Sequence, residues 1–291
     1  GGTVFENNHG TAPGAALEKN GKCVIILPGP PGELVPMFNE RARGFLKKYS
    51  DGAIVSHTVN IIGMGESSVA EEIEDMFDAK NPTVAPYAKS GEVRLRITAK
   101  AETADEADKM CAPVVDEICS RLGDVVYGTD MNSIEERVVT LLKEKGKKIA
   151  TAESCTAGYI PKRLTDIPGA SEVFECGIVS YSNDIKTKLL GVSPKTLETY
   201  GAVSEQTARE MALGAKRVSG ADIAISTTGL AGPGGDGILP GGLSFAAVTD
   251  GERTVVEKIV TGHENDREYN RYVTASRALN LARLMLEEKI K

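Results

Sequence analysis

The most constraining feature of the sequence is the alternation of strand-like and helix-like segments that begins at Ser133. Ser133 and Glu136 have the spacing of an N-terminal capping box, and Gly146 is placed to end the helix that follows. A probable hairpin crosses Asp250-Gly251, and a C-terminal helix is expected from about Asp266. Between them the periodicity predicts strands at 147–152, 174–181 and 222–228 and helices at 156–165, 183–190 and 205–219. This alternation predicts an α/β fold, with a three-layer α/β/α domain over residues 133–291 and ligands at the carboxyl ends of its strands.

Two other regions precede this domain. Residues 51–128 show the order βαββαβ, which predicts a ferredoxin-like α+β domain, and the linker GTDMNS follows it. In the first 50 residues, CVIILPG predicts a short buried strand, and a helix-like segment follows it. One strand and one helix cannot bury two faces alone, so residues 1–50 are interpreted as a fragment of a domain. A length of 291 residues agrees with more than one domain.

Charge and the rarer residues exclude several classes of function. Lys and Arg number 34 against 41 Asp and Glu, a net charge of −7 that argues against binding of nucleic acid. No apolar run approaches the roughly 20 residues that a membrane span needs. Five widely spaced cysteines without a CxxC pair fit reduced thiols in a cytoplasmic protein, and three scattered histidines predict no metal site and no metal cofactor. Acid–base chemistry is therefore expected from Lys, Tyr or carboxylates.

Three predicted strand ends carry hydroxyl groups and small residues. The first, TAESCTAG, places Ser154 and Thr156 at a helix start, which either binds an anion through free amides or is capped by these side chains. The second, SYSNDIK, ends a strand at Tyr181 and places Lys186 about one turn into the next helix, where it could also be a solvated surface lysine.

The third strand end is TTGLAGPGGDGILPGG. Its Thr228-Gly229 permits close approach of a ligand to the backbone, although a mobile surface loop explains it equally well. The letters GxGxxG occur at 232–237, but a strand and not a helix follows them, so they are not a dinucleotide fingerprint. Together the three ends predict a pocket for a phosphorylated small molecule. Cys155, next to a helix start, is a rival nucleophile without an evident histidine base.

Seven ordered motifs resemble the competence/damage-inducible protein A family, CinA, over nearly the whole chain. They are GTAPG, LPGPPGEL, GMGES, AESCTAG, GIVSYSNDIK, GAVSEQTAREMA and TTGLAGPGG. The resemblance implies a C-terminal amidohydrolase domain that converts nicotinamide mononucleotide to nicotinate mononucleotide and ammonia without a cofactor. It also implies that residues 1–50 are the end of a molybdopterin-binding-like α/β domain, which in some members is linked to hydrolysis of ADP-ribose.

The resemblance also implies roles for individual residues. It makes Ser171 the catalytic serine, with Tyr181 and Lys186 beside it, and Ser154, Thr228 and Arg267 would hold the substrate. The family commonly has glycine where Ala157 stands. However, a strand over 174–181 would separate Ser171 from Tyr181 by roughly 25 Å. The conflict leaves three alternatives open: Ser154 is the nucleophile, the strand is short and bent, or two subunits of a homodimer or larger homo-oligomer share the site.

Two other functions remain possible at this point. One is a regulatory, competence-related module that binds a nucleotide without turnover. The other is an ADP-ribose pyrophosphatase, which would depend on the incomplete N-terminal domain.

Overall fold

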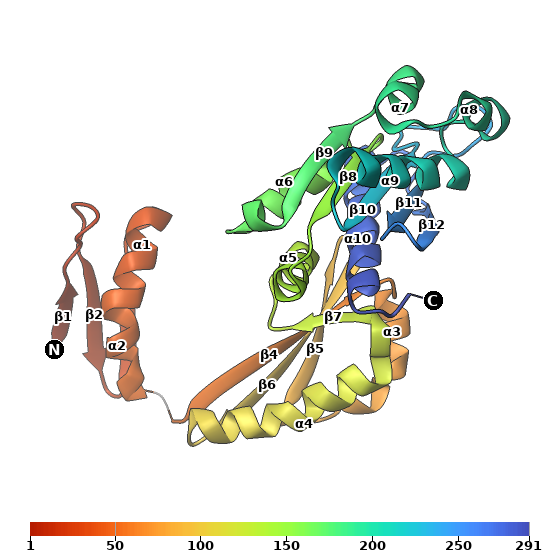
Figure 1. Ribbon diagram of the computed structural model, residues 1–291. Coiled ribbons are helices and arrows are strands. Elements are labelled where there is room, and N and C mark those ends of the chain that lie inside the picture. Colours follow the sequence, from red (N-terminus) through yellow and green to blue (C-terminus); the bar gives the residue numbers. More distant parts are fainter. Residues whose placement is uncertain (50, 291) are drawn as a thin grey trace. The chain divides into compact units, whose positions relative to one another are not determined.

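The computed structural model describes residues 1–49 and 51–290, except for the side chains of residues 88 and 89. The chain divides into two compact units (Figure 1). One comprises Gly1–Ile54 with Lys100–Ala107, and the other comprises Val55–Ala99 with Asp108–Lys291. Within the described residues, no helix combines the length and the apolar character needed to cross a bilayer.

The N-terminal region forms a three-stranded antiparallel sheet with helices against one of its faces. Its order is β1-β2-β3, and the core on the covered face consists of Phe5, Ala16, Met37 and Ala42. The sequence indicated only one strand here, so β1 and β2 were missed. The elements are β1 Gly2–Phe5, β2 Gly14–Lys19, β3 Lys22–Ile26, α1 Pro31–Met37 and α2 Arg43–Leu46.

The opposite face of this small sheet is apolar and open. Leu17 pairs with Val24, Ala15 pairs with Ile26, and Val4 pairs with Ala15, so these side chains share one face. Val4, Leu17, Val24 and Ile26 are 70%, 56%, 60% and 58% exposed. The sheet therefore has a core on one side only.

The middle region has the predicted βαββαβ order. Its sheet has the strand order β5-β6-β4-β7, which is the arrangement of a ferredoxin-like fold, so this prediction is confirmed. The elements are β4 Ala53–Ile62, α3 Glu66–Glu72, β5 Thr83–Lys89, β6 Glu92–Ala101, α4 Ala104–Leu122 and β7 Val126–Thr129.

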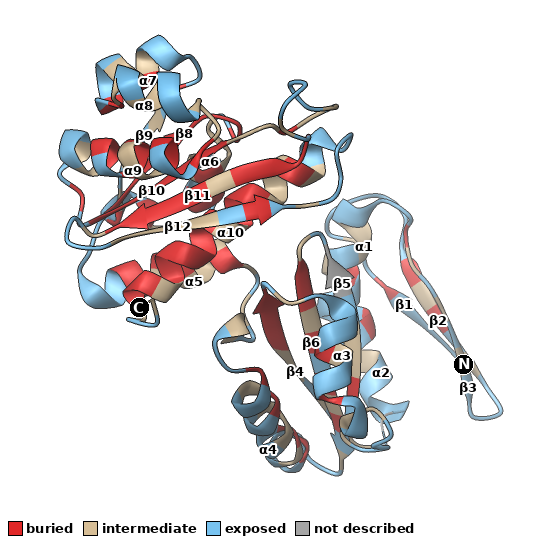
Figure 2. Ribbon diagram, turned by 90° about the vertical axis from the view of Figure 1, so that its right-hand side faces the viewer, coloured by how far each residue is buried: buried red, intermediate tan, exposed pale blue. Residues whose placement is uncertain are grey.

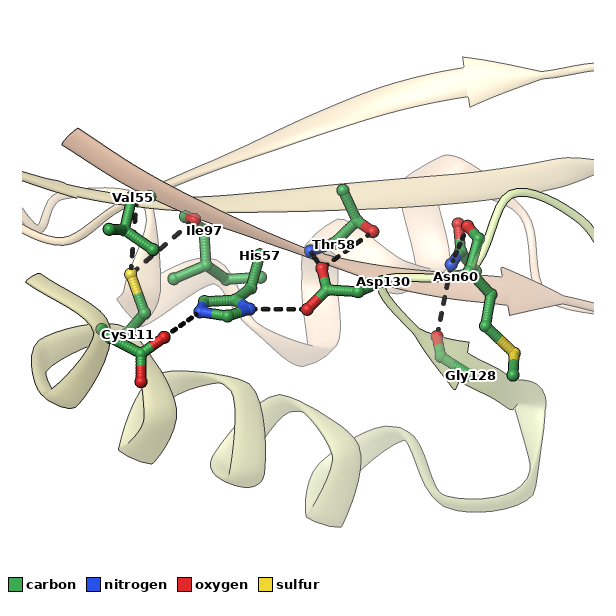
Figure 3. A network of polar contacts seen from close by, with 10 residues as sticks. Val55, His57, Thr58, Asn60, Ile97, Cys111, Gly128 and Asp130 are labelled. Atoms are coloured by element: carbon green, nitrogen blue, oxygen red, sulfur yellow. Dashed lines mark hydrogen bonds and ion pairs between the residues drawn. The ribbon is translucent and has the colours of Figure 1, made fainter. Parts of the chain in front are cut away.

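His57 on β4 joins this sheet to α4 and to the segment after β7 (Figure 3). Its Nδ1 lies 2.6 Å from Asp130 Oδ2, and its Nε2 lies 2.9 Å from Asp108 Oδ1 on α4. The hydrogen bond with Asp130 is the main reason that the pKa of His57 is raised above its ordinary value. An imidazolium held between two carboxylates therefore links three parts of the region.

The C-terminal region is a five-stranded sheet with helices on both faces, as predicted. Its order is β12-β11-β10-β8-β9, in which β9, β8 and β10 are parallel and β11 and β12 are antiparallel. The sequence missed helix α8, and β9 ends at Val179, two residues earlier than predicted. The strands are β8 Ile149–Glu153, β9 Phe174–Val179, β10 Ile223–Gly229, β11 Leu243–Thr249 and β12 Thr254–Val260. The helices are α5 Ile134–Lys145, α6 Tyr159–Thr165, α7 Asn183–Leu190, α8 Pro194–Tyr200, α9 Glu205–Ser219 and α10 Arg267–Leu286.

Alternate residues of the central strands supply two separate cores. Ile149, Ile223 and Ile225 pack with α5 and α10, whereas Ala150 and Ala224 pack with α9 on the other face. Figure 2 shows this burial along β10, β11 and α10. The small residues on the α9 side allow the helix to approach the sheet closely. Both faces are thus covered, and the carboxyl ends of β8, β9 and β10 meet at one edge.

Candidate active site

The three predicted strand ends meet around one cavity at this edge. The cavity has a volume of about 330 Å³ and is bordered by the segments that follow β8, β9 and β10 and by the start of α10. Of the predicted site residues, those that line it are Ser154, Tyr181, Lys186, Thr228, Gly229 and Arg267.

Lys186 lines the cavity, and its amino group has three hydrogen-bonding partners. Its Nζ lies 3.1 Å from Ser154 Oγ, 2.9 Å from the carbonyl oxygen of Ser180 and 3.2 Å from that of Tyr181. Helix α7 positions it, because Ser182 caps this helix by accepting a hydrogen bond from the amide of Ile185. Ser154 therefore has an amine within hydrogen-bonding distance of its hydroxyl.

Burial changes the acidity of this lysine. Lys186 is only 1% exposed, and desolvation lowers its pKa. Lys188 is exposed to solvent on the same helix. Residues two apart on a helix project about 200° apart, so only one of the two can face the site. The neutral form is therefore easier to reach for Lys186 than for a lysine exposed to solvent.

The start of α6 does not bind an anion from outside in the way that the sequence indicated. The buried carboxylate of Glu153 lies there, and its Oε2 accepts a hydrogen bond of 3.2 Å from the amide of Ile160. Neither Ser154 nor Thr156 caps the helix. Burial raises the pKa of Glu153, and among the described residues its Oε1 has no hydrogen-bond partner. The anion-binding position is therefore filled by the chain itself.

Two residues that were predicted to bind substrate, Thr156 and Thr228, form hydrogen bonds within the protein. Thr156 is buried, with its hydroxyl 2.6 Å from that of Thr227, and it does not line the cavity. Thr228 lines the cavity but donates its hydroxyl to the carbonyl of Ala202 at 2.6 Å. Gly229 lacks a side chain because a Cβ would lie 2.4 Å from that of Ser244. A glycine at this position therefore allows β10 to pack closely against β11.

The glycine-rich segment after β10 also lines the cavity. Gly232 and Gly234 have φ of 90° and 70°, which favours glycine, and the strand β11 follows, so the GxGxxG letters are not a dinucleotide fingerprint. Among the described residues, no acceptor is found for the amides of Ala231 and Gly235, both of which line the cavity. Arg267 lies beside them and donates to the carbonyl of Gly232 at 2.7 Å. This wall offers a cation and free amides to an anionic group.

Cys155 and Tyr181 have contrasting surroundings. Burial raises the pKa of the Cys155 thiol to about 12, so it stays protonated and is a poor nucleophile. The side chain of Tyr181 is 63% exposed at the cavity wall, and its backbone carbonyl is the group that contacts Lys186.

Ser171 is not brought to Tyr181 and Lys186 within the chain. It lies in the short 3-10 helix Ala170–Glu172, just before β9 begins, whereas Tyr181 lies after β9 ends. The six residues of β9 span about 20 Å, so the two ends of this strand lie at opposite edges of the sheet. The expectation that Ser171 lies beside these residues is therefore not met in one subunit, and the strand is not bent enough to bring them together.

Sequence reasoning missed two residues near the cavity. Asn183, the first residue of α7, lines it. Arg271 on α10 donates from Nη2 to the carbonyl of Thr156 at 2.6 Å. Its spacing of four from Arg267 puts both arginines on one face of a helix, and this was the signal available in the sequence.

Comparison with known proteins identifies the family. The CinA C-terminal domain family matches residues 131–286, and the damage-inducible protein CinA KH domain family matches residues 56–128. The chain is 53% identical over 268 residues to a protein of Clostridium beijerinckii named as competence-damage inducible, covering 91% of this chain and 65% of that one. It is 45% identical over 286 residues to a CinA-like protein of Desulfovibrio desulfuricans, covering 97% and 67%.

A solved structure is also similar. The crystal structure of the competence/damage inducible protein CihA from Agrobacterium tumefaciens matches with a TM-score of 0.51 and 39% identity, over 53% of this chain and 93% of that one. The chain spans about two thirds of the length of the curated relatives it matches. From the family matches, the identities and the shared fold we conclude that the chain belongs to the CinA family.

Proposed function

We propose that the C-terminal domain hydrolyses the carboxamide of nicotinamide mononucleotide, with Ser154 as the nucleophile and Lys186 as its general base. The observation that carries this proposal is the set of three contacts made by Lys186 Nζ. A neutral amine has two N–H donors and one lone pair. In the structure Nζ donates to the hydroxyl of Ser154 as well as to the carbonyls of Ser180 and Tyr181. When Lys186 is neutral, the two carbonyls can accept its two N–H groups, which leaves the lone pair for the hydroxyl of Ser154.

The proposed reaction needs no other base. Lys186 takes the proton of Ser154 as Oγ attacks the carboxamide carbon, and it then returns the proton to the departing ammonia. Lys186 then deprotonates a water, which attacks the resulting ester, and it returns this proton to Ser154 Oγ as the ester bond breaks and nicotinate mononucleotide leaves.

Other residues that line the cavity support binding of the rest of this substrate. Arg267 and the amides of Ala231 and Gly235 offer charge and N–H donors to a phosphate. The exposed Tyr181 also lines the cavity, and we propose that its ring covers the pyridine. A cavity that contains both a nucleophile and a cation supports a substrate with a carboxamide and a phosphate.

Ammonia release from nicotinamide mononucleotide tests the proposal. We expect Lys186→Met to lower kcat by at least about 10²-fold, because a positioned base is lost while most of the aliphatic stem is kept. Lys188→Met is the matched control on the same helix and is expected to stay near wild type. Activity of the wild type is expected to rise with pH as Lys186 loses its proton, since only the neutral amine is a base. Equal losses in the two variants would contradict the role of Lys186.

A second pair of variants separates the two candidate nucleophiles. We expect Ser154→Ala to abolish turnover, by about 10⁴-fold or more, and Ser171→Ala to keep it. The reverse result would favour a site completed by Ser171 of another subunit. A folded wild-type protein that binds the nucleotide but releases no ammonia would favour the regulatory module.

A further inference from the structure

Arg271 contacts the turn that carries Ser154, although it lies on a helix more than 100 residues later in the sequence. Its Nη2 donates to the carbonyl of Thr156 at 2.6 Å, and its guanidinium carbon lies 5.6 Å from the centre of the Tyr159 ring. Both partners belong to the segment between Ser154 and the first turn of α6. Arg271 thus holds this segment through its contacts with Thr156 and Tyr159.

A short chain of hydrogen bonds connects Thr156, the partner of Arg271, to Ser154. The hydroxyl of Thr156 lies 2.6 Å from that of Thr227, and the carbonyl of Thr227 accepts the amide of Ser154 at 3.0 Å. Between Thr156 and α6, Ala157 and Gly158 have φ of 50° and 87°. A turn with two consecutive residues in the left-handed region needs contacts from elsewhere to hold it, and Arg271 supplies one.

The surroundings of Arg271 also connect it with the cavity of Ser154. Its Nε is buried and has no hydrogen-bond partner among the described residues. Arg271 and Arg267 together line a second cavity of about 320 Å³ with Tyr159 and Glu268, and Arg267 also lines the cavity of Ser154. One face of α10 therefore bears both the cation at the substrate wall and the donor on the nucleophile turn.

We propose that Arg271 is a positioning residue that holds the turn after Ser154 so that the hydroxyl of Ser154 faces Lys186. This inference deepens the proposed function and concerns the same site. Arg271 does not touch the reacting atoms, so its loss affects kcat more than KM.

Arg277 gives a matched control on the same helix. It too has a buried Nε without a partner among the described residues, but its guanidinium is paired with Glu257 on β12. Arg277→Met therefore removes a comparable side chain without touching the nucleophile turn.

The test measures turnover of nicotinamide mononucleotide and, separately, the rate at which phenylmethylsulfonyl fluoride labels Ser154, followed by mass spectrometry. We expect Arg271→Met to lower kcat and the labelling rate by about 10- to 100-fold, with KM within about threefold, because a small misplacement of a reacting group has effects of this size. Arg271→Lys, which retains a donor for the carbonyl of Thr156, is expected to recover part of both rates. Arg277→Met is expected to leave both rates near wild type.

The two readouts separate this inference from the proposed function. A wild type that is labelled at Ser154 but releases no ammonia would contradict the substrate, while the labelling series still tests Arg271. Wild-type labelling of folded Arg271→Met, or a loss in KM alone, would overturn the positioning role. If Arg271→Met does not fold, Arg271→Gln replaces it with the same expectations, and an unlabelled wild type would overturn both proposals.

Discussion

The N-terminal and C-terminal sheets are built from similar short apolar strands but differ in what covers them. The C-terminal sheet has one core against α5 and α10 and another against α9. The N-terminal sheet has one small core, and its other face exposes four large apolar side chains, Val4, Leu17, Val24 and Ile26. An apolar strand pattern therefore indicates which face of a sheet is apolar, but not whether another layer of structure covers that face. In the sheet with two cores, the strand ends converge on the cavity that contains Ser154 and Lys186.

The largest expected effect comes from matched core and face substitutions in the two sheets. Ile225→Ala removes a fully buried side chain of β10, and we expect it to lower the free energy of unfolding by about 2–5 kcal/mol. Val24→Ser on the exposed face of β3 is expected to change it by less than about 0.5 kcal/mol. Chemical denaturation of both variants checks this. A cost at Val24 as large as that at Ile225 would show that the N-terminal face is covered in solution.

The middle sheet tests how much a polar link between a strand and a helix stabilises the fold. The pKa of His57 is raised above 6.5, so the protonated ring stabilises the fold below about pH 6.5, and this contribution is lost as the pH rises through the higher folded-state pKa. We expect His57→Gln to cost on the order of 1 kcal/mol at pH 6 and progressively less in alkaline solution. Asp116→Asn, on the same helix as Asp108, serves as the control. A cost that does not depend on pH would contradict an imidazolium at this position.

The smallest expected effect concerns strain beside the site in the fully covered sheet. Ala157 has φ of 50°, a conformation that favours glycine, so we expect Ala157→Gly to raise the free energy of unfolding by up to about 1 kcal/mol. Gly146 has φ of 60° at the end of α5 with open space around it, so Gly146→Ala should have the opposite sign and a similar size. Thermal unfolding of both variants measures this. Destabilisation by Ala157→Gly would show that the Ala157 methyl group makes contacts that outweigh the strain.

Local patterns in the sequence determined much of the C-terminal fold. Ser133 accepts a hydrogen bond from the amide of Glu136 at 3.3 Å, and Gly146 ends the helix in the left-handed conformation, as the capping pattern predicted. Helix periodicity allows only one of Lys186 and Lys188 to face the site, and the family resemblance together with the distance from Tyr181 points to Lys186, which is the buried one. These features depend on residues within one or two turns of each other, so a single sequence contains the necessary information.

The tertiary structure alone decided which groups meet at the site. Glu153 fills the start of α6, Ser154 and not Ser171 lies beside Lys186, and Arg271 reaches Thr156 across 115 residues of sequence. The open face of the N-terminal sheet is likewise invisible in its strand pattern, which is the same for covered and uncovered faces. Such contacts depend on strand order and on how helices pack over the sheet, and neither is set by local periodicity. The sequence by itself therefore determined most elements of the middle and C-terminal regions and the sheet edge that carries the cavity, and the packing of distant segments determined the chemistry available there.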